Sequence, residues 1–297
     1  MVVIGGSASQ KLAAEIATYL DDKLALIETK KFPDGERYIR INEKINSDEQ
    51  VIVVQSTGYP QDENILELLF ILDTLEDMNI KEIILISPYL GYSRQERRFK
   101  DTECISAKTI SKLIESRNIK SLITVNLHED SIRNFYEKPV YNLSAMPAIV
   151  KYLKTHQSNI IKNKPVILAP DKGALNFAKD IAIDLDTEYD YLEKVRLSPE
   201  KVETKTKNID VTNKDVIIID DIISTGGTIV NAIKILHKQK AKDITVICVH
   251  PVFVNDAILK IYAAGAKDII STNTLKSDVS SISLAELIAE KIKLIIN

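Results

Sequence analysis

Cysteine is scarce in this sequence, and apolar runs of membrane-spanning length are absent. The two cysteines, Cys104 and Cys248, lie far apart and neither belongs to a CxxC pair, which argues against a disulfide framework and a zinc site. No run reaches the roughly 18 apolar residues of a membrane-spanning helix. The opening Met-Val-Val-Ile-Gly-Gly has no basic segment of the kind that begins a signal peptide. We therefore expect a soluble, untargeted protein of the reducing cytoplasm.

An excess of charge of one sign is also missing. The formal net charge is −3 and the pI is near 5.9, so nothing draws the whole molecule to nucleic acid or to an anionic membrane. The Gly-x-x-x-x-Gly-Lys-Ser/Thr loop of P-loop enzymes does not occur either. Anionic ligands, ATP included, must then be bound by local clusters of another kind.

The sequence does contain a repeated pattern of short buried runs and helical segments. Its 297 residues are 45% hydrophobic and 27% charged, which suits a globular chain of two domains of about 150 residues each. Runs rich in Val and Ile predict parallel strands covered by helices on both faces. These runs are 2–4, 51–54, 83–86, 122–125, 166–168, 216–219 and 244–249.

The order of segments in the first half returns in the second. A strand, a turn and a helix span 2–19 and 166–185, and a strand, loop, helix and strand span 51–88 and 216–251. Such self-similarity predicts a duplicated α/β domain. A cluster of Pro, Asn and Ser marks the boundary between the copies. The predicted domains are residues 1–144 and 145–297.

A loop in the second half has the residues of a sugar-phosphate site. Asp220 and Asp221 follow a predicted strand, and Ser224-Thr-Gly-Gly-Thr228 opens the next helix, at the strand edge where parallel sheets bind ligands. Glycines let a phosphate approach the backbone, and the amides of a helix start point at it. The carboxylates suit ribose hydroxyls or Mg²⁺. A plain capped turn is the alternative, but a cap does not need two acids, two glycines and two threonines together.

This loop resembles the phosphoribosyl diphosphate (PRPP) motif shared by phosphoribosyltransferases and PRPP synthetases. Further segments resemble the ribose-phosphate diphosphokinase (PRPP synthetase) family alone. They are Lys31-Phe-Pro-Asp-Gly-Glu36, Tyr89-Leu-Gly-Tyr-Ser-Arg-Gln-Glu-Arg-Arg98, Asn126-Leu-His128, Ala169-Pro-Asp-Lys-Gly173 and Glu193-Lys-Val-Arg196. The last segment falls in a polar stretch between a predicted helix and a predicted strand, and matches the family's flexible loop.

The resemblance implies two tandem phosphoribosyltransferase-like domains, each a mainly parallel sheet flanked by helices, with a protruding β-hairpin in the first. It implies transfer of the β,γ-diphosphoryl group of ATP to the C1 hydroxyl of ribose 5-phosphate, giving PRPP and AMP. It also implies two Mg²⁺ ions, one arriving with ATP. A homo-oligomer, dimer or hexamer, is expected, in which the hairpin can serve a neighbouring subunit's site.

The resemblance also assigns roles to individual residues. The ATP-binding residues would be Phe32, Asp34, Gly35, Glu36, Arg94, Gln95, Arg97 and His128. The ribose-5-phosphate-binding residues would be Arg196, Asp220, Asp221, Ser224, Thr225, Gly226, Gly227 and Thr228. The metal-binding residues would be His128 and Asp171, and the catalytic residues Lys194 and Arg196. Many relatives carry Asp at the position of Ser224, so ribose recognition would depend more on the acidic pair.

Each segment has a structural alternative when it is considered alone. Pro-Asp-Gly is a good turn, a run of arginines is usually solvated surface, a lone histidine is more often structural, and Asp171 suits a helix N-cap. Two functional alternatives also remain at this point. A phosphoribosyltransferase would need the loop at 220–228 but neither the hairpin nor the arginines. An inactive regulatory subunit would not need to retain Lys194, Arg196, His128 and Asp171.

Overall fold

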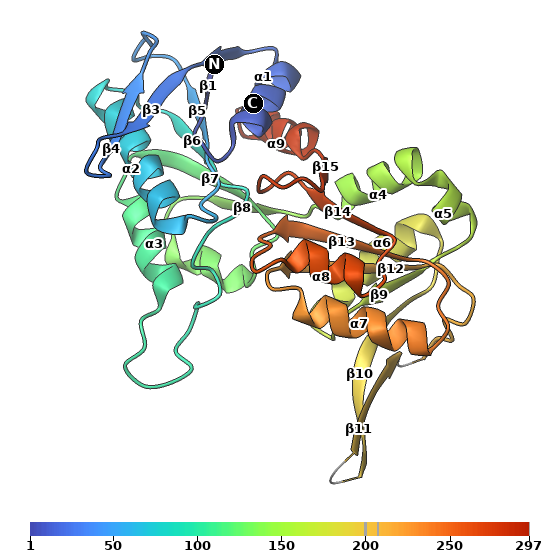
Figure 1. The fold of residues 1–297 in the computed structure, drawn as a ribbon. Helices are drawn as coiled ribbons and strands as arrows, with labels where there is room; N and C mark the ends of the chain where they lie inside the picture. Colours follow the sequence, from blue (N-terminus) through green and yellow to red (C-terminus); the bar gives the residue numbers. More distant parts are fainter. Residues whose placement is uncertain (199–200, 207, 297) are drawn as a thin grey trace. The chain divides into compact units, whose positions relative to one another are not determined.

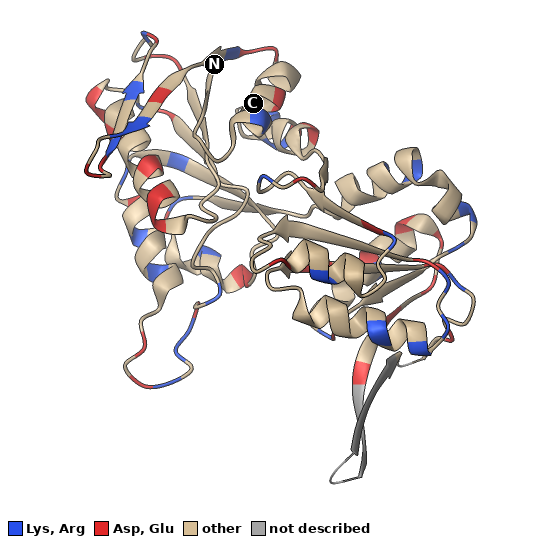
Figure 2. Cartoon of the chain, viewed as in Figure 1, with Lys and Arg blue, Asp and Glu red and all other residues tan. Residues whose placement is uncertain are grey.

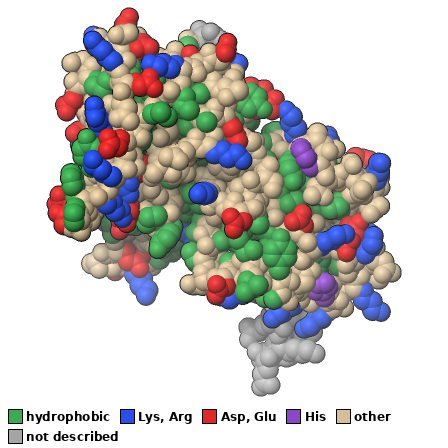
Figure 3. Space-filling view, turned by 45° about the horizontal axis from the view of Figure 1, so that its top comes forward, with side chains coloured by type: hydrophobic (Ala, Val, Ile, Leu, Met, Phe, Trp, Pro, Cys, Tyr) green, Lys and Arg blue, Asp and Glu red, His purple; other side chains and the backbone are tan. Residues whose placement is uncertain are grey.

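The structure is a computed structural model that describes residues 1–198, 201–206 and 208–296, without the side chains of 194–198 and 201–205. The chain forms two compact units (Figure 1). Unit 1 comprises Met1–Ser144, Thr274–Lys276 and Ser283–Asn297, and unit 2 comprises Ala145–Asn273 and Ser277–Ile282. Basic and acidic side chains lie interspersed on the face drawn in Figure 3.

Unit 1 is built on a six-stranded parallel sheet of order β2-β1-β5-β6-β7-β8. Alternate residues of the central strands pack against α2 and α3 in one apolar cluster, so these two helices cover one face, while α1 packs with α9. The strands are β1 (Val2–Gly5), β2 (Lys23–Ala25), β5 (Val51–Val54), β6 (Ile83–Ile86), β7 (Ile119–Val125) and β8 (Val140–Leu143), with a separate hairpin of β3 (Ile27–Lys31) and β4 (Arg37–Ile41). The helices are α1 (Gln10–Leu20), α2 (Gln61–Asp77), α3 (Ser106–Glu115), η1 (Asp130–Phe135) and α9 (Ala285–Ile296).

Unit 2 is built on a seven-stranded sheet of order β11-β10-β9-β12-β13-β14-β15, in which only β11 runs antiparallel to its neighbour in the described residues. Helices α7 and α8 contribute to its main apolar cluster. The strands are β9 (Val166–Ala169), β10 (Tyr189–Ser198), β11 (Lys201–Thr206), β12 (Val216–Ile223), β13 (Ile244–Pro251), β14 (Asp268–Thr272) and β15 (Ser280–Ile282). The helices are α4 (Met146–His156), α5 (Ser158–Lys162), α6 (Leu175–Leu185), α7 (Gly227–Lys238) and α8 (Ala257–Ala263).

The two units repeat one topology. The order β2-β1-β5-β6-β7-β8 of unit 1 corresponds strand for strand to β10-β9-β12-β13-β14-β15 of unit 2. The helices after the matching strands β1 and β9 also end in the same way, because Asp21 after α1 and Asp186 after α6 both adopt the left-handed conformation, with φ of 56° and 52°. The predicted fold class is confirmed, including the hairpin in the first half. None of the helices in the described ranges is long and apolar enough to cross a membrane.

Three features differ from the sequence prediction. The polar stretch before residue 216 forms the antiparallel ribbon β10–β11, which gave no apolar signal because charged residues alternate along it. Strand β12 continues to Ile223, so the acidic pair lies within a strand. At the end of the chain, α9 belongs to unit 1; it buries Ile288 and Ile292, and Lys293 donates to the Tyr19 carbonyl at 3.1 Å.

Candidate active site

The loop between β12 and α7 is shaped by a glycine in the left-handed region. Gly226 is the N-cap of α7 with φ 75° and ψ 0°, and no described side chain caps the helix. A Cβ at Gly226 would meet the Ile261 side chain at 3.3 Å and the Ala257 carbonyl at 3.4 Å. Glycine is therefore required here both by the backbone conformation and by space. The uncapped helix start leaves its first amides directed at solvent, where an anion can accept from them.

The next residue of the loop has a different reason to be glycine. Gly227 is exposed, and a Cβ on it would meet only the Thr225 hydroxyl, at 3.9 Å. The loop is fixed from behind, since Phe253 and Val254 donate backbone N–H groups to the carbonyls of Ile223 and Ser224 at 3.0 and 3.1 Å. The protein itself does not need the space beside Gly227, which leaves that space for a ligand.

The acidic pair lies directly before this loop and brings two carboxylates close together. The Asp220 carboxylate accepts from the Asp221 N–H at 3.0 Å, and that of Asp221 accepts from the Ile222 N–H at 2.8 Å. The pKa of Asp220 is raised to about 8, mainly by burial and also by the charges of Asp221 and Asp171. A cation, or a ligand hydroxyl that donates, would offset this accumulation of negative charge.

Asp171 follows the neighbouring strand β9 at the same edge of the unit 2 sheet. Its carboxylate accepts from the Gly173 N–H at 2.8 Å, and a Cβ on Gly173 would lie 3.1 Å from that oxygen. The alternative role of Asp171 as the helix N-cap is wrong, because α6 begins at Leu175 and its N-cap is Ala174. The side chain of Asp171 is exposed, so its second oxygen can reach a ligand.

In unit 1, the turn of the β3–β4 hairpin presents the predicted adenine-binding residues. Phe32 donates its N–H to the Glu36 carbonyl at 2.8 Å and accepts from the Gly35 N–H at 2.9 Å, while Gly35 has φ 97°. The Phe32 ring is 45% exposed and meets the Tyr38 ring edge-on at 6.0 Å. The side chains of Asp34 and Glu36 are exposed. The turn is thus confirmed as a turn, and its free aromatic face and carboxylates suit a base and a ribose.

The arginine segment lies in the long loop between β6 and α3, where basic and acidic residues follow one another (Figure 2). Arg94 is exposed, and no hydrogen bond or ion pair is made to it within the described residues. Arg97 pairs with Glu96 at 3.2 Å. Gln95 donates to the Glu103 carboxylate at 3.2 Å. The loop therefore offers an unpaired guanidinium for a polyphosphate.

Glu103 holds this loop together and was not identified from the sequence. Its carboxylate accepts from the N–H groups of Phe99 and Lys100 at 2.9 and 3.0 Å, and its carbonyl accepts from the Arg98 guanidinium at 2.9 Å. The backbone donors, Phe99 first, lower the pKa of Glu103. No periodic pattern marks such a residue, because its partners are local backbone groups.

His128 follows β7 through a turn that begins at Asn126, which has φ 40°. The turn is held to β8 by the Asn126 N–H, which donates to the Leu143 carbonyl at 2.9 Å, and by the Leu127 N–H, which donates to the Asn142 side chain at 3.0 Å. The imidazole is exposed. In the ranges that the structure describes, no group of three His, Cys, Asp or Glu residues could hold a metal ion. The metal roles of His128 and Asp171 stay predictions.

Lys194 and Arg196 lie on β10, but their side chains fall outside the described part of the chain. Of the predicted site residues, unit 2 brings Asp171, the acidic pair and the loop at 224–228 to one sheet edge. Unit 1 contains the hairpin turn, the arginine segment and His128.

Comparison with known proteins agrees with this arrangement along the whole chain. Residues 1–117 match the family model for the N-terminal domain of ribose phosphate pyrophosphokinase, and residues 140–282 match that of the phosphoribosyl transferase domain. The ribose-phosphate pyrophosphokinase of Methanothermobacter thermautotrophicus is 53% identical over 98% of this chain and 100% of the relative, and that of Methanobrevibacter smithii is 52% identical over the same shares.

A solved structure supports the same conclusion. The crystal structure of phosphoribosylpyrophosphate synthetase from Mycobacterium smegmatis matches with a TM-score of 0.87 and 28% identity, and the match covers 99% of this chain and 98% of that one. The resemblance predicted from the motifs is thereby confirmed. The chain belongs to the ribose-phosphate pyrophosphokinase family.

Proposed function

We propose that this protein is a ribose-phosphate diphosphokinase, which uses ATP and ribose 5-phosphate to make PRPP and AMP. One observation carries the proposal: relatives of that name match this chain over nearly its whole length, and the chain has both an open anion loop in unit 2 and an exposed aromatic turn in unit 1. A phosphoribosyltransferase would account for the loop alone.

We assign ribose 5-phosphate to the unit 2 edge. The phosphate accepts from the first amides of α7 and from the hydroxyls of Thr225 and Thr228, and the space beside Gly227 admits it. The carboxylates of Asp220 and Asp221 accept from the ribose hydroxyls. Ser224 lacks the carboxylate that many relatives have at this position, so the acidic pair bears more of the sugar recognition.

We assign the nucleotide to the residues of unit 1. The exposed face of Phe32 stacks on the adenine, and Asp34 and Glu36 accept from its amino group or from its ribose. Arg94, Gln95 and Arg97 neutralise the polyphosphate, and the unpaired state of Arg94 among the described residues supports that role.

The residues also fit Mg²⁺, which prefers carboxylate and phosphate oxygens and is usually bound by one or two carboxylates together with the substrate. In unit 2, Asp171 would hold Mg²⁺, and the raised pKa of Asp220 supports the presence of a cation at this edge. In unit 1, His128 would contact Mg²⁺ through a water. When bound, Mg²⁺ supplies positive charge to the polyphosphate. The number of ions, two, remains part of the proposal.

The chemical step is a displacement at phosphorus. The C1 hydroxyl oxygen of the sugar attacks the β-phosphorus of ATP and loses its proton, the bond from that phosphorus to the oxygen bridging to the α-phosphate breaks, and AMP leaves with that oxygen. The protein's part is to position both reactants and to compensate charge. Lys194 and Arg196 are proposed to interact with the group in transfer.

A direct assay tests the proposal. Purified protein is incubated with Mg-ATP and ribose 5-phosphate, and AMP and PRPP are measured, with excess EDTA as the control. We expect equal amounts of both products and no turnover in EDTA. Consumption of PRPP with a purine or pyrimidine base would indicate a phosphoribosyltransferase instead, and the absence of AMP and PRPP formation in a folded protein would indicate a regulatory subunit.

A further inference from the structure

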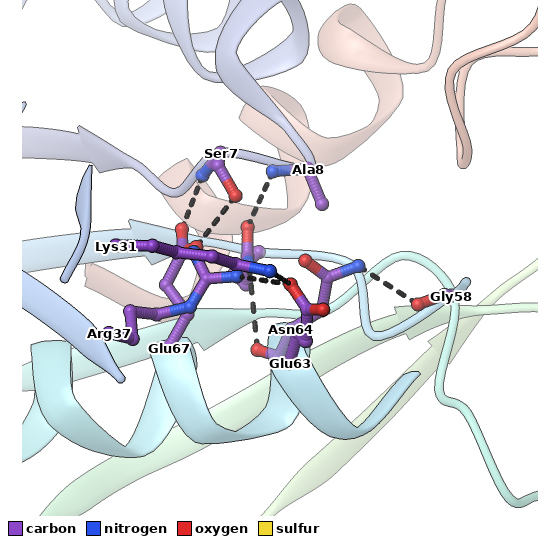
Figure 4. A network of polar contacts seen from close by, with 9 residues as sticks. Ser7, Ala8, Lys31, Arg37, Gly58, Glu63, Asn64 and Glu67 are labelled. Carbon is purple, nitrogen blue, oxygen red and sulfur yellow. Dashed lines mark hydrogen bonds and ion pairs between the residues drawn. The ribbon is translucent and has the colours of Figure 1, made fainter. Parts of the chain in front are cut away.

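A fully buried carboxylate lies in unit 1, away from every predicted site residue in sequence. Glu67 of α2 is 0% exposed. It accepts from the backbone N–H of Ser7 at 2.5 Å and from the Ser7 hydroxyl at 2.6 Å, and the Arg37 guanidinium donates to the same carboxylate (Figure 4). One charge thus joins α2, the loop after β1 and strand β4 of the hairpin.

A second carboxylate of α2 binds the hairpin on both of its strands. Lys31 and Arg37 are the last cross-strand pair before the turn, and two like charges placed opposite each other repel. Glu63, one helical turn before Glu67, accepts from Lys31 at 2.7 Å and from Arg37 at 3.0 Å. The helix therefore offsets the repulsion at the point where the ladder ends and the turn begins.

The anchored turn is the one that presents the nucleotide-binding residues. Phe32 directly follows Lys31, and Glu36 directly precedes Arg37. The side chain of Arg37 is only 11% exposed, so loss of its carboxylate partners would leave a nearly buried cation uncompensated. Loss of the α2 contacts would therefore act directly on the residues at both ends of the turn.

The network also reaches the loop after β5, which keeps α2 itself in place. The Gln55 side chain accepts from the Ala8 N–H at 3.1 Å, and Asn64 of α2 donates to the Gly58 carbonyl at 2.9 Å (Figure 4). The support for the hairpin is therefore connected to the carboxyl edge of the unit 1 sheet and does not end at an exposed ion pair.

We propose that Arg37, Glu63 and Glu67 are positioning residues that hold the hairpin turn in its nucleotide-binding orientation. The inference rests on the proposed function, in which Phe32, Asp34 and Glu36 bind ATP. A purely structural network would stabilise unit 1 and affect both substrates alike. A positioning network acts on ATP selectively, because preorganised groups lower the cost of binding their own ligand.

The test compares Glu63→Gln and Arg37→Met with Glu28→Gln. Glu28 forms an ion pair with Lys30 at 3.1 Å on the same hairpin, without a bond to α2, and serves as the matched control. KM is measured for Mg-ATP and for ribose 5-phosphate. We expect Glu63→Gln and Arg37→Met to raise the KM for ATP roughly tenfold, the scale of one lost charge-assisted hydrogen bond, with that for ribose 5-phosphate changed less than about twofold. Glu28→Gln changes neither.

Hydrogen exchange provides a measurement that does not depend on activity. Glu63 is 42% exposed, so its substitution leaves the core intact and carries the test even where the buried Glu67→Gln variant fails to fold. We expect faster exchange of the Phe32 and Gly35 amides, which are bonded across the turn, in Glu63→Gln and Arg37→Met and unchanged exchange in Glu28→Gln.

The Phe32→Ala variant distinguishes failure of the positioning role from failure of the nucleotide site. If Phe32→Ala raises the KM for ATP while Glu63→Gln and Arg37→Met change both KM values equally or leave both unchanged, the positioning role is overturned and the nucleotide site stands. If Phe32→Ala leaves the KM for ATP unchanged, the proposed nucleotide site fails and the positioning role fails with it.

Discussion

The same two loops occur at the carboxyl edge of each sheet, yet they are closed in unit 1 and open in unit 2. After the first strand, Ser7 of unit 1 donates to the internal carboxylate of Glu67, whereas Asp171 of unit 2 is exposed. After the next strand, Ser56 and Thr57 are fully buried, and the Ser56 hydroxyl donates to the Thr274 carbonyl at 2.5 Å. The hydrogen-bond donors of these two unit 1 loops are thus paired with acceptors of unit 1 itself.

Unit 2 has the opposite balance. Its loop at 224–228 exposes threonine residues and an uncapped helix start, and burial together with the charges of Asp221 and Asp171 raises the pKa of Asp220. A duplicated fold can therefore devote one copy to an external ligand, while the other fills the equivalent edge with its own side chains and uses them to support a hairpin. The predictions below test that division.

The largest expected effect is that of Lys194→Ala. Lys194 lies in the ribbon β10–β11, which is part of the unit 2 sheet, whereas the β3–β4 hairpin of unit 1 is separate from the unit 1 sheet. If the lysine meets charge that develops during transfer, kcat falls by about 10² to 10³ while the KM values change little. Steady-state kinetics with both substrates measures this, and Lys214→Ala, which breaks a surface pair with Glu188, is the control. A rise in KM with kcat unchanged would mean that the lysine only binds substrate.

A second prediction concerns whether the hairpin and the ribbon that form one site come from different copies of the chain. We propose a homo-oligomer with shared sites. Glu36→Ala and Lys194→Ala proteins, each nearly inactive, are mixed and their subunits exchanged. For a randomly mixed dimer we expect about one quarter of the wild-type rate, since half of the dimers carry one intact site. Light scattering establishes the assembly, and activity no greater than the sum of the two variants would contradict site sharing.

A third prediction uses glycines to compare the open and the closed edge. Gly227→Ala fits the folded chain, so it should leave the melting temperature nearly unchanged while raising the KM for ribose 5-phosphate roughly tenfold or more, because the methyl group occupies ligand space. Gly226→Ala, at φ 75°, should cost about 1 to 2 kcal/mol of stability.

The matching position in unit 1 is Gly58, where a Cβ would lie 2.4 Å from the Leu275 side chain. Gly58→Ala should therefore lower stability with no selective effect on ribose 5-phosphate. Thermal unfolding and the two KM values are compared for all three variants. A selective KM effect at Gly58 would show that the unit 1 edge also admits ligand.

Much of the fold on which this comparison rests could be predicted from the sequence. Strands β5 and β6 and helix α6 have the predicted bounds, because buried parallel strands are continuous apolar runs and the helix has a regular apolar face. The position of the loop at 224–228 between a strand and a helix was also predictable, since its residue types and its place after a strand are local features. The ribbon β10–β11 was missed because backbone pairing, and not an apolar run, holds it.

The supports of the site were beyond prediction for a different reason. Glu67 lies 60 residues from Ser7 and 30 residues from Arg37, and only the fold shows that a charged residue on α2 is buried. The distinction between Gly226 and Gly227 likewise depends on φ and on neighbours from α8. Such roles arise from three-dimensional packing and leave no periodic pattern.

The last prediction concerns the pH dependence of the metal-free protein. Because the pKa of Asp220 rises from 3.8 to about 8 on folding, the protonated carboxyl favours the folded state. This contribution is complete below the usual pKa and is lost as the pH rises towards 8. Unfolding of wild type and Asp220→Asn in EDTA should thus diverge, the wild type losing stability relative to the variant as the pH increases. Added Mg²⁺ should stabilise the wild type more at high pH, where no proton has to be displaced.

Asp210→Asn gives a control of opposite sign in the same unit. The hydrogen bonds from Thr212 lower the pKa of Asp210, so its contribution is present above the usual carboxyl pKa and is lost as the pH falls. Relative to this variant, the wild type should lose stability only at acid pH. If Asp220→Asn instead parallels the wild type at every pH, the acidic pair is not short of positive charge, and unit 2 would differ from unit 1 in the accessibility of its loops but not in the charge that they present.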